Sequence, residues 1–435
     1  MRRGKLRRSN IAPLAALMAG MFITCPIPLP GLGEDGTGPR TTDLLNFASA
    51  GLLVVALFRS TRLNRAIYGV VLVWALSVPW VFMEIYGLSG ATDPAVQRVL
   101  VRWLLCACAA YWITVATENP MLRSRFLYGL LIGVVPSLLT VTYDFLTFSP
   151  EDVPIDELVL LAIYNGKDIH DFAYRAYGFF GHPNAAAGCM LLGVPVLIGA
   201  VAEGRLPRWS ILIAVALMGS VFYLTKSRGP LIVSTALVAY WLWSQGRGPR
   251  LLLVVTALAT ALVTLAAGQF ATEWAGGVLL DRFVDTESIS DNADGRWWTI
   301  ATSLEMVLQN PLGMGSAYVE PLEIATGTNA THNAYLELGL MGGVPLMVLI
   351  VIRLLNAATG LFMPLQRAEA WVASYLLGVF AFETYFLLLN IQLVTVWLVV
   401  SPLRPLSKQA PVAIARPMHR VRGQVVARTP EDQPG

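Results

Sequence analysis

Long apolar runs, each close to the length needed to cross a bilayer as a helix, recur along most of this chain. A helical span needs about 20 apolar residues to match the hydrocarbon thickness of a membrane. Ten runs meet or approach this length, at residues 11–30, 43–59, 66–87, 99–116, 126–147, 185–202, 209–226, 229–244, 251–270 and 338–355. A last apolar block, residues 371–403, is too long for one crossing, and we interpret it as two crossings that turn near Asn390. The pattern therefore predicts about twelve spans.

Two long segments interrupt the apolar pattern without being polar enough to be loose linkers, namely residues 148–184 and 271–337. Both contain apolar positions at helical spacing, so we expect them to fold onto the membrane part. The predicted organisation is spans one to nine over residues 1–270 with the segment 148–184 among them, a large helical loop over 271–337, spans ten to twelve over 338–403, and a disordered tail over 404–435.

Composition and charge add an orientation to this pattern. The 435 residues are 55% hydrophobic and 14% charged, which excludes an ordinary soluble globular domain and indicates an all-α polytopic membrane protein. Most Lys and Arg residues fall on one side of the predicted spans, and the positive-inside rule makes that side the cytoplasm, with both termini there. The segments 148–184 and 271–337 then lie outside. The cations that this topology leaves outside are Arg40, Arg98, Arg102, Lys167, Arg175, Lys226, Arg228, Arg282 and Arg296.

Five charged residues lie inside apolar runs, each in the outer half of its predicted helix: Glu84, Arg102, Asp144, Lys226 and Glu383. Charge within a membrane is costly and usually lines a cavity or pairs with another group. The pattern therefore predicts a polar cavity open to the outer face. The alternative is that these side chains only extend to the nearer membrane interface.

The stretch from residue 295 to residue 345 combines a polar start with an apolar end. Thr331 is predicted to cap a helix that has His332 in its first turn and runs on through Gly339 and Gly343 into the apolar span. Upstream, Arg296 is predicted to open a second helix after the start signal at Asn292 and Asp294. An arginine and a histidine would then be presented from two helix N-termini.

Four groups of polar residues fall on the predicted outer face: the segment Arg175 to Asn184, the turn Lys226-Ser-Arg228, Arg296 and His332. Guanidinium groups bind phosphate oxygens through two parallel hydrogen bonds and keep their charge in any environment. Several such cations around one outer cavity indicate a lipid-linked diphosphate as ligand. The simpler alternatives are that Arg175 anchors a loop to lipid, that Lys226 flanks a span, and that His182 caps a loop.

The order of these motifs is similar to that in a known family. G-F-F-G-H-P-N-A-A-A-G at 178, S-R-G at 227, R-x-x-W at 296, N-P-L-G-M-G at 310 and H-N-A-Y-L-E-L-G-L-M-G-G at 332 resemble the O-antigen ligase and O-antigen polymerase superfamily of lipopolysaccharide biosynthesis, and ligases most of all. The motifs cover about residues 165 to 355. The resemblance implies a GT-C-like, inverting glycosyltransferase of the bacterial inner membrane that needs no metal or other cofactor and whose active site faces the periplasm.

The resemblance also implies partners and residue roles. The donor would be a glycan on undecaprenyl diphosphate and the acceptor a sugar hydroxyl of the lipid A core, with membrane lipids around the protein and no nucleic acid. His332 would be the catalytic base. The predicted diphosphate ligands are Arg228, Arg296, Arg175 and Lys226, and the possible further substrate contacts are His182, Asn184 and Asn333. A helix dipole and the nearby arginines should hold the pKa of His332 below its usual value of about 6.5.

The sequence leaves alternatives open for metal binding and for the function. Asp285 and Glu287 form a D-x-E pair of the kind that holds a divalent ion in other enzymes of this fold type, whereas the four cysteines have no spacing that indicates a disulfide framework or a zinc site. An O-antigen polymerase and a protein O-oligosaccharyltransferase share the motifs. A twelve-span secondary transporter would share the number of spans, although transporters place polar groups near the midplane.

Overall fold

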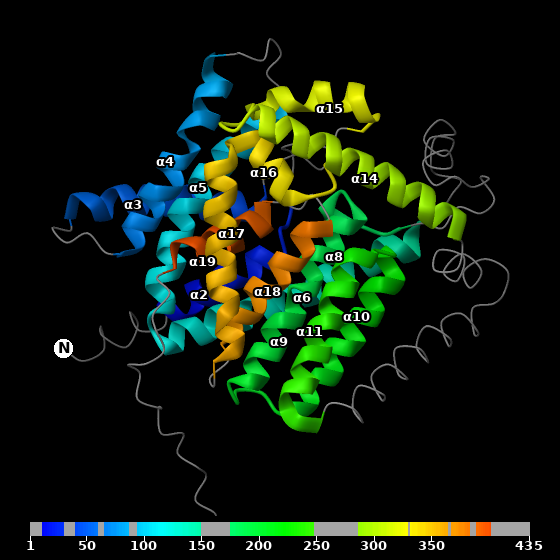
Figure 1. The fold of residues 1–435 in the computed structure, drawn as a ribbon. Helices are drawn as coiled ribbons and strands as arrows, with labels where there is room; N and C mark the ends of the chain where they lie inside the picture. The colour runs from blue at the N-terminus through cyan, green and yellow to red at the C-terminus, as the bar shows by residue number, and fades with distance from the viewer. Residues whose placement is uncertain are drawn as a thin grey trace, which may run out of the picture. The chain divides into compact units, whose positions relative to one another are not determined.

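The fold is that of a computed structural model, which describes residues 11–29, 40–59, 65–86, 94–148, 175–247, 286–328, 331–363, 367–382 and 389–401. These residues form helices and their connections, and no strand is among them (Figure 1). The predicted ninth span, the charged residues Glu383 and Asp285, and the tail lie outside the described residues, as does most of the segment 148–184. The number of spans is therefore not tested, whereas the all-α class is confirmed.

The first half of the chain and the last two helices supply most of the apolar core. The helices are α2 (Ile11–Thr24), α3 (Thr41–Arg59), α4 (Arg65–Tyr86), α5 (Pro94–Thr117), α6 (Pro120–Thr147), α8 (Pro183–Leu191), α9 (Gly193–Ala202), α10 (Ile211–Thr225), α11 (Arg228–Leu242), α14 (Thr286–Gln309), α15 (Val319–Thr326), α16 (Ala334–Gly342), α17 (Val344–Ala358), α18 (Ala368–Phe382) and α19 (Leu389–Val400). Two separate helices, α18 and α19, arise within the block 371–403, as a double crossing requires.

Six helical stretches of the described residues are long and apolar enough to cross a membrane. They are Ala66–Ile85, Val99–Thr117, Pro120–Thr147, Pro183–Ala202, Arg208–Thr225 and Val344–Phe362, and three shorter apolar helices cover Ala12–Thr24, Ala368–Ala381 and Ile391–Val400. These stretches coincide with predicted spans. The chain is thus a polytopic membrane protein by length and composition.

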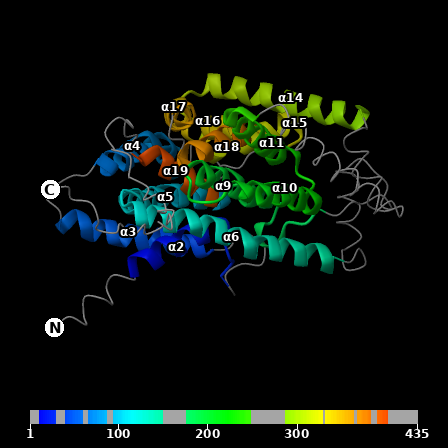
Figure 2. The same cartoon turned by 90° about the horizontal axis from the view of Figure 1, so that it is seen from below.

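Small residues allow α2 and α6 to pack backbone against backbone. A Cβ atom on Gly20 would lie 2.2 Å from the Phe126 carbonyl oxygen, and one on Gly129 would lie 2.0 Å from the Leu17 carbonyl oxygen. Close approach of this kind is the usual way in which membrane helices associate. The Thr24 hydroxyl donates to the Leu130 carbonyl at 2.8 Å, and this bond lies in the same contact. Figure 2 shows α2 and α6 along one edge of the helices and α14 along the opposite edge.

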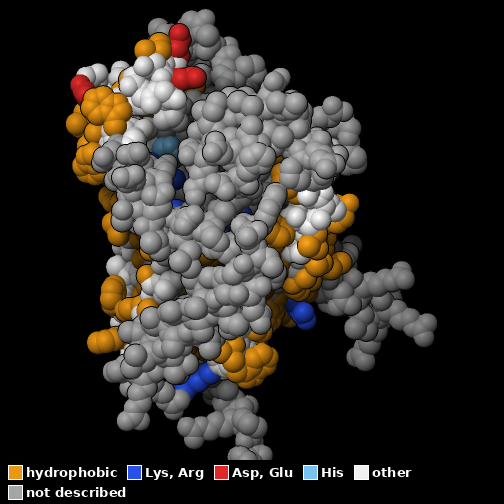
Figure 3. Space-filling view, turned by 90° about the vertical axis from the view of Figure 1, so that its right-hand side faces the viewer, with side chains coloured by type: hydrophobic (Ala, Val, Ile, Leu, Met, Phe, Trp, Pro, Cys, Tyr) orange, Lys and Arg blue, Asp and Glu red, His pale blue; other side chains and the backbone are white. Residues whose placement is uncertain are grey.

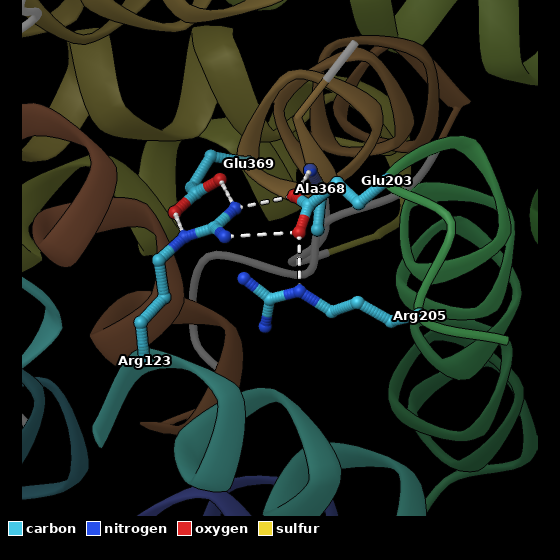
Figure 4. A network of polar contacts seen from close by, with 5 residues as sticks. All are labelled: Arg123, Glu203, Arg205, Ala368 and Glu369. Carbon is cyan, nitrogen blue, oxygen red and sulfur yellow. Dashed lines mark hydrogen bonds and ion pairs between the residues drawn. The ribbon is translucent and has the colours of Figure 1, made fainter. Parts of the chain in front are cut away.

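A partly buried ion network ties three helices at one end of the bundle (Figure 4). Arg123, near the start of α6, donates to both oxygens of Glu203 at 3.0 and 2.5 Å and to both oxygens of Glu369 at the start of α18. Arg205 pairs with Glu203 at 2.8 Å, and the Ala368 amide donates to Glu203 at 2.9 Å. The network holds the start of α6 and the end of α9, whereas the residues predicted to bind substrate lie at the opposite ends of these helices.

The predicted tenth span is interrupted, and this corrects the expectation that His332 leads straight into it. Helix α16 ends at Gly342, and Gly343 adopts a left-handed conformation (φ 86°) before α17 begins. Pro345 at the start of α17 has no N–H for a continuing helix. The turn after Pro311 packs against this break, since the Val344 amide donates to the Pro311 carbonyl at 2.8 Å. A Cβ atom on Gly313 would lie 2.6 Å from the Gly343 nitrogen, so two of the quoted motifs meet here.

Candidate functional site

Arg175 holds the segment Arg175 to Asn184 against the end of α10. Its Nε donates to the Thr225 carbonyl at 3.0 Å and its Nη2 donates to Asn184 Oδ1 at 2.6 Å, while the Ala176 amide donates to the Leu224 carbonyl at 3.0 Å. Both ends of the segment Arg175 to Asn184 are therefore held beside the turn that carries Lys226 and Arg228. The sequence placed these segments on one face. It had no signal for the backbone carbonyl of Thr225, which joins them.

Asp144 holds the middle of the same segment. Its Oδ2 accepts hydrogen bonds from the Tyr177 and Gly178 amides, each at 2.8 Å. Gly178 has a φ of 52°, and a Cβ atom there would lie 3.2 Å from the backbone of Thr140 and Val141, so the close approach to α6 favours glycine. Asp144 thus binds backbone amides of this segment.

Two other charged residues of the predicted cavity also bind protein groups. Glu84 is buried and accepts hydrogen bonds from the Ser316 amide at 2.6 Å and the Ser316 hydroxyl at 2.9 Å. Arg102 pairs with Asp43 at 3.2 Å. For these residues and Asp144, pairing with other parts of the fold accounts for the charge, so they give no support to the predicted cavity.

His182 is the N-cap of α8. Its Nδ1 accepts a hydrogen bond from the Asn184 amide at 3.2 Å, and Pro183 occupies the first helical position, where a missing N–H costs nothing. The capping alternative for His182 is therefore confirmed. Although part of the side chain reaches solvent, the surrounding protein lowers the pKa of His182 from 6.5 to about 4, mainly by desolvation and then through the charges of Arg175 and His332.

Lys226 and Arg228 lie on the turn between α10 and α11. Lys226 ends α10 in a left-handed conformation (φ 52°), and the buried Ser227 precedes α11, whose first residue is Arg228. Arg228 is half-buried and lies within electrostatic range of Arg296, so the two charges repel. Guanidinium groups kept close together in this way favour an anion between them.

Arg296 lies inside a long helix, which corrects the prediction that it opens one. Helix α14 begins at Thr286 and continues to Gln309, so Asn292 and Asp294 lie in its interior, where Asn and Asp weaken a helix without necessarily ending it. At helical spacing, Arg296 shares a face with Thr299, Ser303 and Val307, which are all buried. This face contacts α16. Arg296 is therefore on the side of α14 that faces the rest of the protein.

His332 lies before its helix, and Thr331 is not the cap. Asn333 Oδ1 accepts from the Tyr335 and Leu336 amides at 3.0 and 3.1 Å, which makes Asn333 the N-cap of α16. Asn is at least as good a cap as Thr, and the Thr331 hydroxyl instead donates to the Asn333 carbonyl at 2.8 Å. His332 consequently precedes the helix with a φ of 53°. Asn333, predicted as a substrate contact, already uses its carboxamide oxygen within the fold.

The imidazole of His332 is held neutral by its surroundings. Burial lowers its pKa from 6.5 to about 4, and the charge of Arg296 acts in the same direction. The direction agrees with the sequence-based expectation, but the main cause is burial and not the helix dipole. Among the described residues, neither ring nitrogen of His332 has a hydrogen-bond partner. A neutral ring with an available lone pair can accept a proton.

These residues form one electrostatically connected group. Arg175 and His332 lower the pKa of His182, and Arg296 lowers the pKa of both His332 and Arg228. Figure 3 shows a histidine and several Lys or Arg side chains set back from the surface on one face of the molecule. In the described part of the chain, the residues other than glycine with a positive φ are Lys226 and His332, and such strain gathers at functional sites.

A metal site finds no support in the described residues, where no group of three or more His, Cys, Asp or Glu side chains gathers. Asp285 and the side chain of Glu287 fall outside those residues. The four cysteines are buried and none of them is in a disulfide.

The comparison with protein families matches the O-antigen ligase family over residues 213–351. This range includes Lys226, Arg228, Arg296 and His332, whereas Arg175, His182 and Asn184 precede it. No curated protein matches the chain at a significant level. Residues 213–351 therefore match the O-antigen ligase family, which supports the resemblance of the motifs to the O-antigen ligase and polymerase superfamily.

Proposed function

We propose that this protein is an O-antigen ligase, which transfers a polysaccharide from undecaprenyl diphosphate to a sugar hydroxyl of the lipid A core. The reaction would take place on the periplasmic side of the bacterial inner membrane. The observation that carries the proposal is the neutral His332 with an available lone pair beside Arg296, within the region that matches the family. Such a pair offers a base for one substrate and a cation for the other.

The proposed step breaks one bond and forms one. His332 accepts the proton of the acceptor hydroxyl as its oxygen attacks the anomeric carbon of the donor sugar. The bond from that carbon to the phosphate oxygen breaks on the opposite face, the diphosphate leaves with the electron pair, and the configuration inverts. Arg228 and Arg296, with Arg175 and Lys226, stabilise the charge that develops on the diphosphate.

The low pKa of His332 in the free protein suits a site in which binding of the donor substrate raises that pKa. A ring with a pKa of about 4 is a weak base, and a general base works best with a pKa near the working pH. A bound diphosphate adds negative charge near the ring and raises the pKa toward neutrality. Donor binding would therefore prepare His332 for the acceptor.

Four cations placed around the diphosphate supply the neutralisation that a divalent ion provides in other transferases, so we propose that no metal is needed. The resemblance to ligases favours the lipid A core as acceptor. An O-antigen polymerase would use a second lipid-linked glycan, and a protein O-oligosaccharyltransferase a Ser or Thr hydroxyl. A secondary transporter is not favoured, because the matching family is one of glycan-transferring enzymes.

The test uses purified protein, an undecaprenyl-diphosphate-linked glycan and three acceptors in parallel: lipid A core, a second lipid-linked glycan and a Ser/Thr-containing polypeptide. The proposal expects glycan on lipid A core with inverted anomeric configuration, and undiminished turnover after exhaustive chelation. Product on one of the other acceptors alone would replace the ligase by the corresponding enzyme. Loss of turnover that returns with magnesium or manganese would assign the diphosphate to a metal.

A further inference from the structure

One ring nitrogen of His182 accepts a hydrogen bond from the protein, whereas the other has no hydrogen-bond partner among the described residues. Nδ1 accepts the hydrogen bond from the Asn184 amide. Within the described residues, Nε2 has no hydrogen-bond partner, and the side chain is exposed. A neutral imidazole has one N–H and one lone pair. Because Nδ1 supplies the lone pair, the proton is on Nε2, and this nitrogen is a hydrogen-bond donor.

The position of this donor is set by a rigid segment. Arg175 and Asn184, at the two ends of the segment, bond to each other at 2.6 Å, and Asp144 holds its middle through two backbone amides. His182 lies inside this loop, within electrostatic range of both Arg175 and His332. Its donor is therefore held near a proposed diphosphate ligand and the proposed base.

We propose that His182 is a substrate-binding residue, and that its Nε2–H donates a hydrogen bond to a phosphoryl oxygen of the lipid diphosphate. The inference rests on the proposed function and adds a neutral ligand to its cations. A phosphoryl oxygen fits better than a sugar hydroxyl, because a donor beside several cations meets anionic oxygens, which accept the stronger hydrogen bonds. A neutral donor also adds no further like charge to Arg175 and Arg296.

Two substitutions can separate capping by Nδ1 from hydrogen-bond donation by Nε2, because their side chains differ in length. In His182→Asn, Oδ1 takes the place of Nδ1 and can still cap α8, but nothing occupies the position of Nε2. In His182→Gln, the amide group reaches the position of Nε2, and the cap is lost. The two variants should therefore fail in opposite ways.

The experiment measures binding of undecaprenyl diphosphate by calorimetry and stability by thermal unfolding, both in the same detergent. His182→Asn is expected to unfold at the wild-type temperature and to bind about tenfold more weakly, the loss typical of one hydrogen bond to a charged group. His182→Gln is expected to unfold at a lower temperature and to bind more tightly than His182→Asn. At about pH 8 the ring of His182 is neutral with or without bound diphosphate, so the tenfold difference between wild-type and His182→Asn affinity should already be present there.

Wild-type affinity in the stable His182→Asn variant would overturn the inference and leave His182 as a helix cap only. Equal affinities at about pH 8 that diverge only on acidification would also overturn it, because an imidazolium and not a neutral donor would then bind the phosphate. If the wild-type protein does not bind undecaprenyl diphosphate, the proposed function fails and takes this inference with it. Wild-type binding that is lost in Arg228→Ala keeps the proposed function whichever way the His182 variants behave.

Discussion

His332 combines two features that are costly to maintain at a single residue. Its backbone adopts a left-handed conformation, which costs a residue with a Cβ atom roughly 1 kcal/mol or more. Its ring is half-buried beside Arg296, which disfavours the charged form. Packing of Asn333 and α16 holds both features in place. In the proposed reaction, the ring would therefore meet the substrate as a neutral acceptor in a set position, which suits a base better than an anion ligand.

The pH dependence of turnover should differ between the free protein and the protein with bound donor. A base must be neutral, so activity falls as the pH drops through its pKa. In kcat/KM, which reports the free protein, the acid limb should lie near the His332 value of about 4. In kcat it should lie at higher pH, because the bound diphosphate raises the pKa. Steady-state rates across this range check the difference.

Substitution of His332 provides the control for that profile. His332→Ala should be inactive yet still bind donor. Turnover restored by His332→Lys or His332→Arg, or loss of donor binding in His332→Ala, would make His332 a phosphate ligand and not a base.

At the scale of helices, boundaries are set where backbones touch. Helix α16 ends just before Gly343. The neighbouring turn at Gly313 leaves no room for a side chain on Gly343, and the positive φ of Gly343 favours glycine. Helix α14 begins at Thr286 and passes through Asn292 and Asp294, so these residues do not start it. Local signals were misleading at both boundaries, and at Gly343 the contact with the turn at Gly313 decided where the helix ends.

The contact between α2 and α6 gives a test at this scale. Gly129→Leu places a side chain where a Cβ atom would already lie 2.0 Å from the Leu17 carbonyl oxygen, so we expect a loss of about 1–3 kcal/mol or more in stability. Gly51→Leu in α3 is the matched control, because a Cβ atom there meets nothing within 4 Å. It should be neutral or stabilising by up to about 1 kcal/mol through helix propensity. Thermal unfolding in detergent compares the two. Equal stability of both variants would show that α2 and α6 are not packed as described.

At the scale of the whole molecule, the two polar regions lie at opposite ends of the helices. Helix α6 carries Arg123 and its ion network near the start, and Asp144 with the loop of Arg175 near the end. The charge pattern puts the start of α6 in the cytoplasm, so the site would face the periplasm. The proposed transfer to lipid A core takes place on the periplasmic side, so the proposal depends on this predicted orientation.

Cysteine labelling tests the orientation directly. All four natural cysteines are buried, so a cysteine introduced at an exposed position should dominate labelling by a membrane-impermeant reagent. In intact spheroplasts, Glu323→Cys on α15 should react, and Arg208→Cys between α9 and α10 should react only after lysis. Labelling of Arg208→Cys without lysis would reverse the orientation. Labelling of both positions from one side would reject the span order between them.

Hydropathy and charge along the sequence were sufficient for the fold class, because the cost of exposing polar groups to lipid acts on each span separately. Motif order was likewise sufficient for the family, since it needs no coordinates. The arrangement of the site was different. That Asn333 rather than Thr331 caps α16, that Arg296 lies within α14, and that Asp144 and Thr225 hold the loop of His182 all depend on contacts between segments distant in the chain. Side chains such as Thr331 and Asp144 have several possible partners, and only the packed structure decides which one lies within reach.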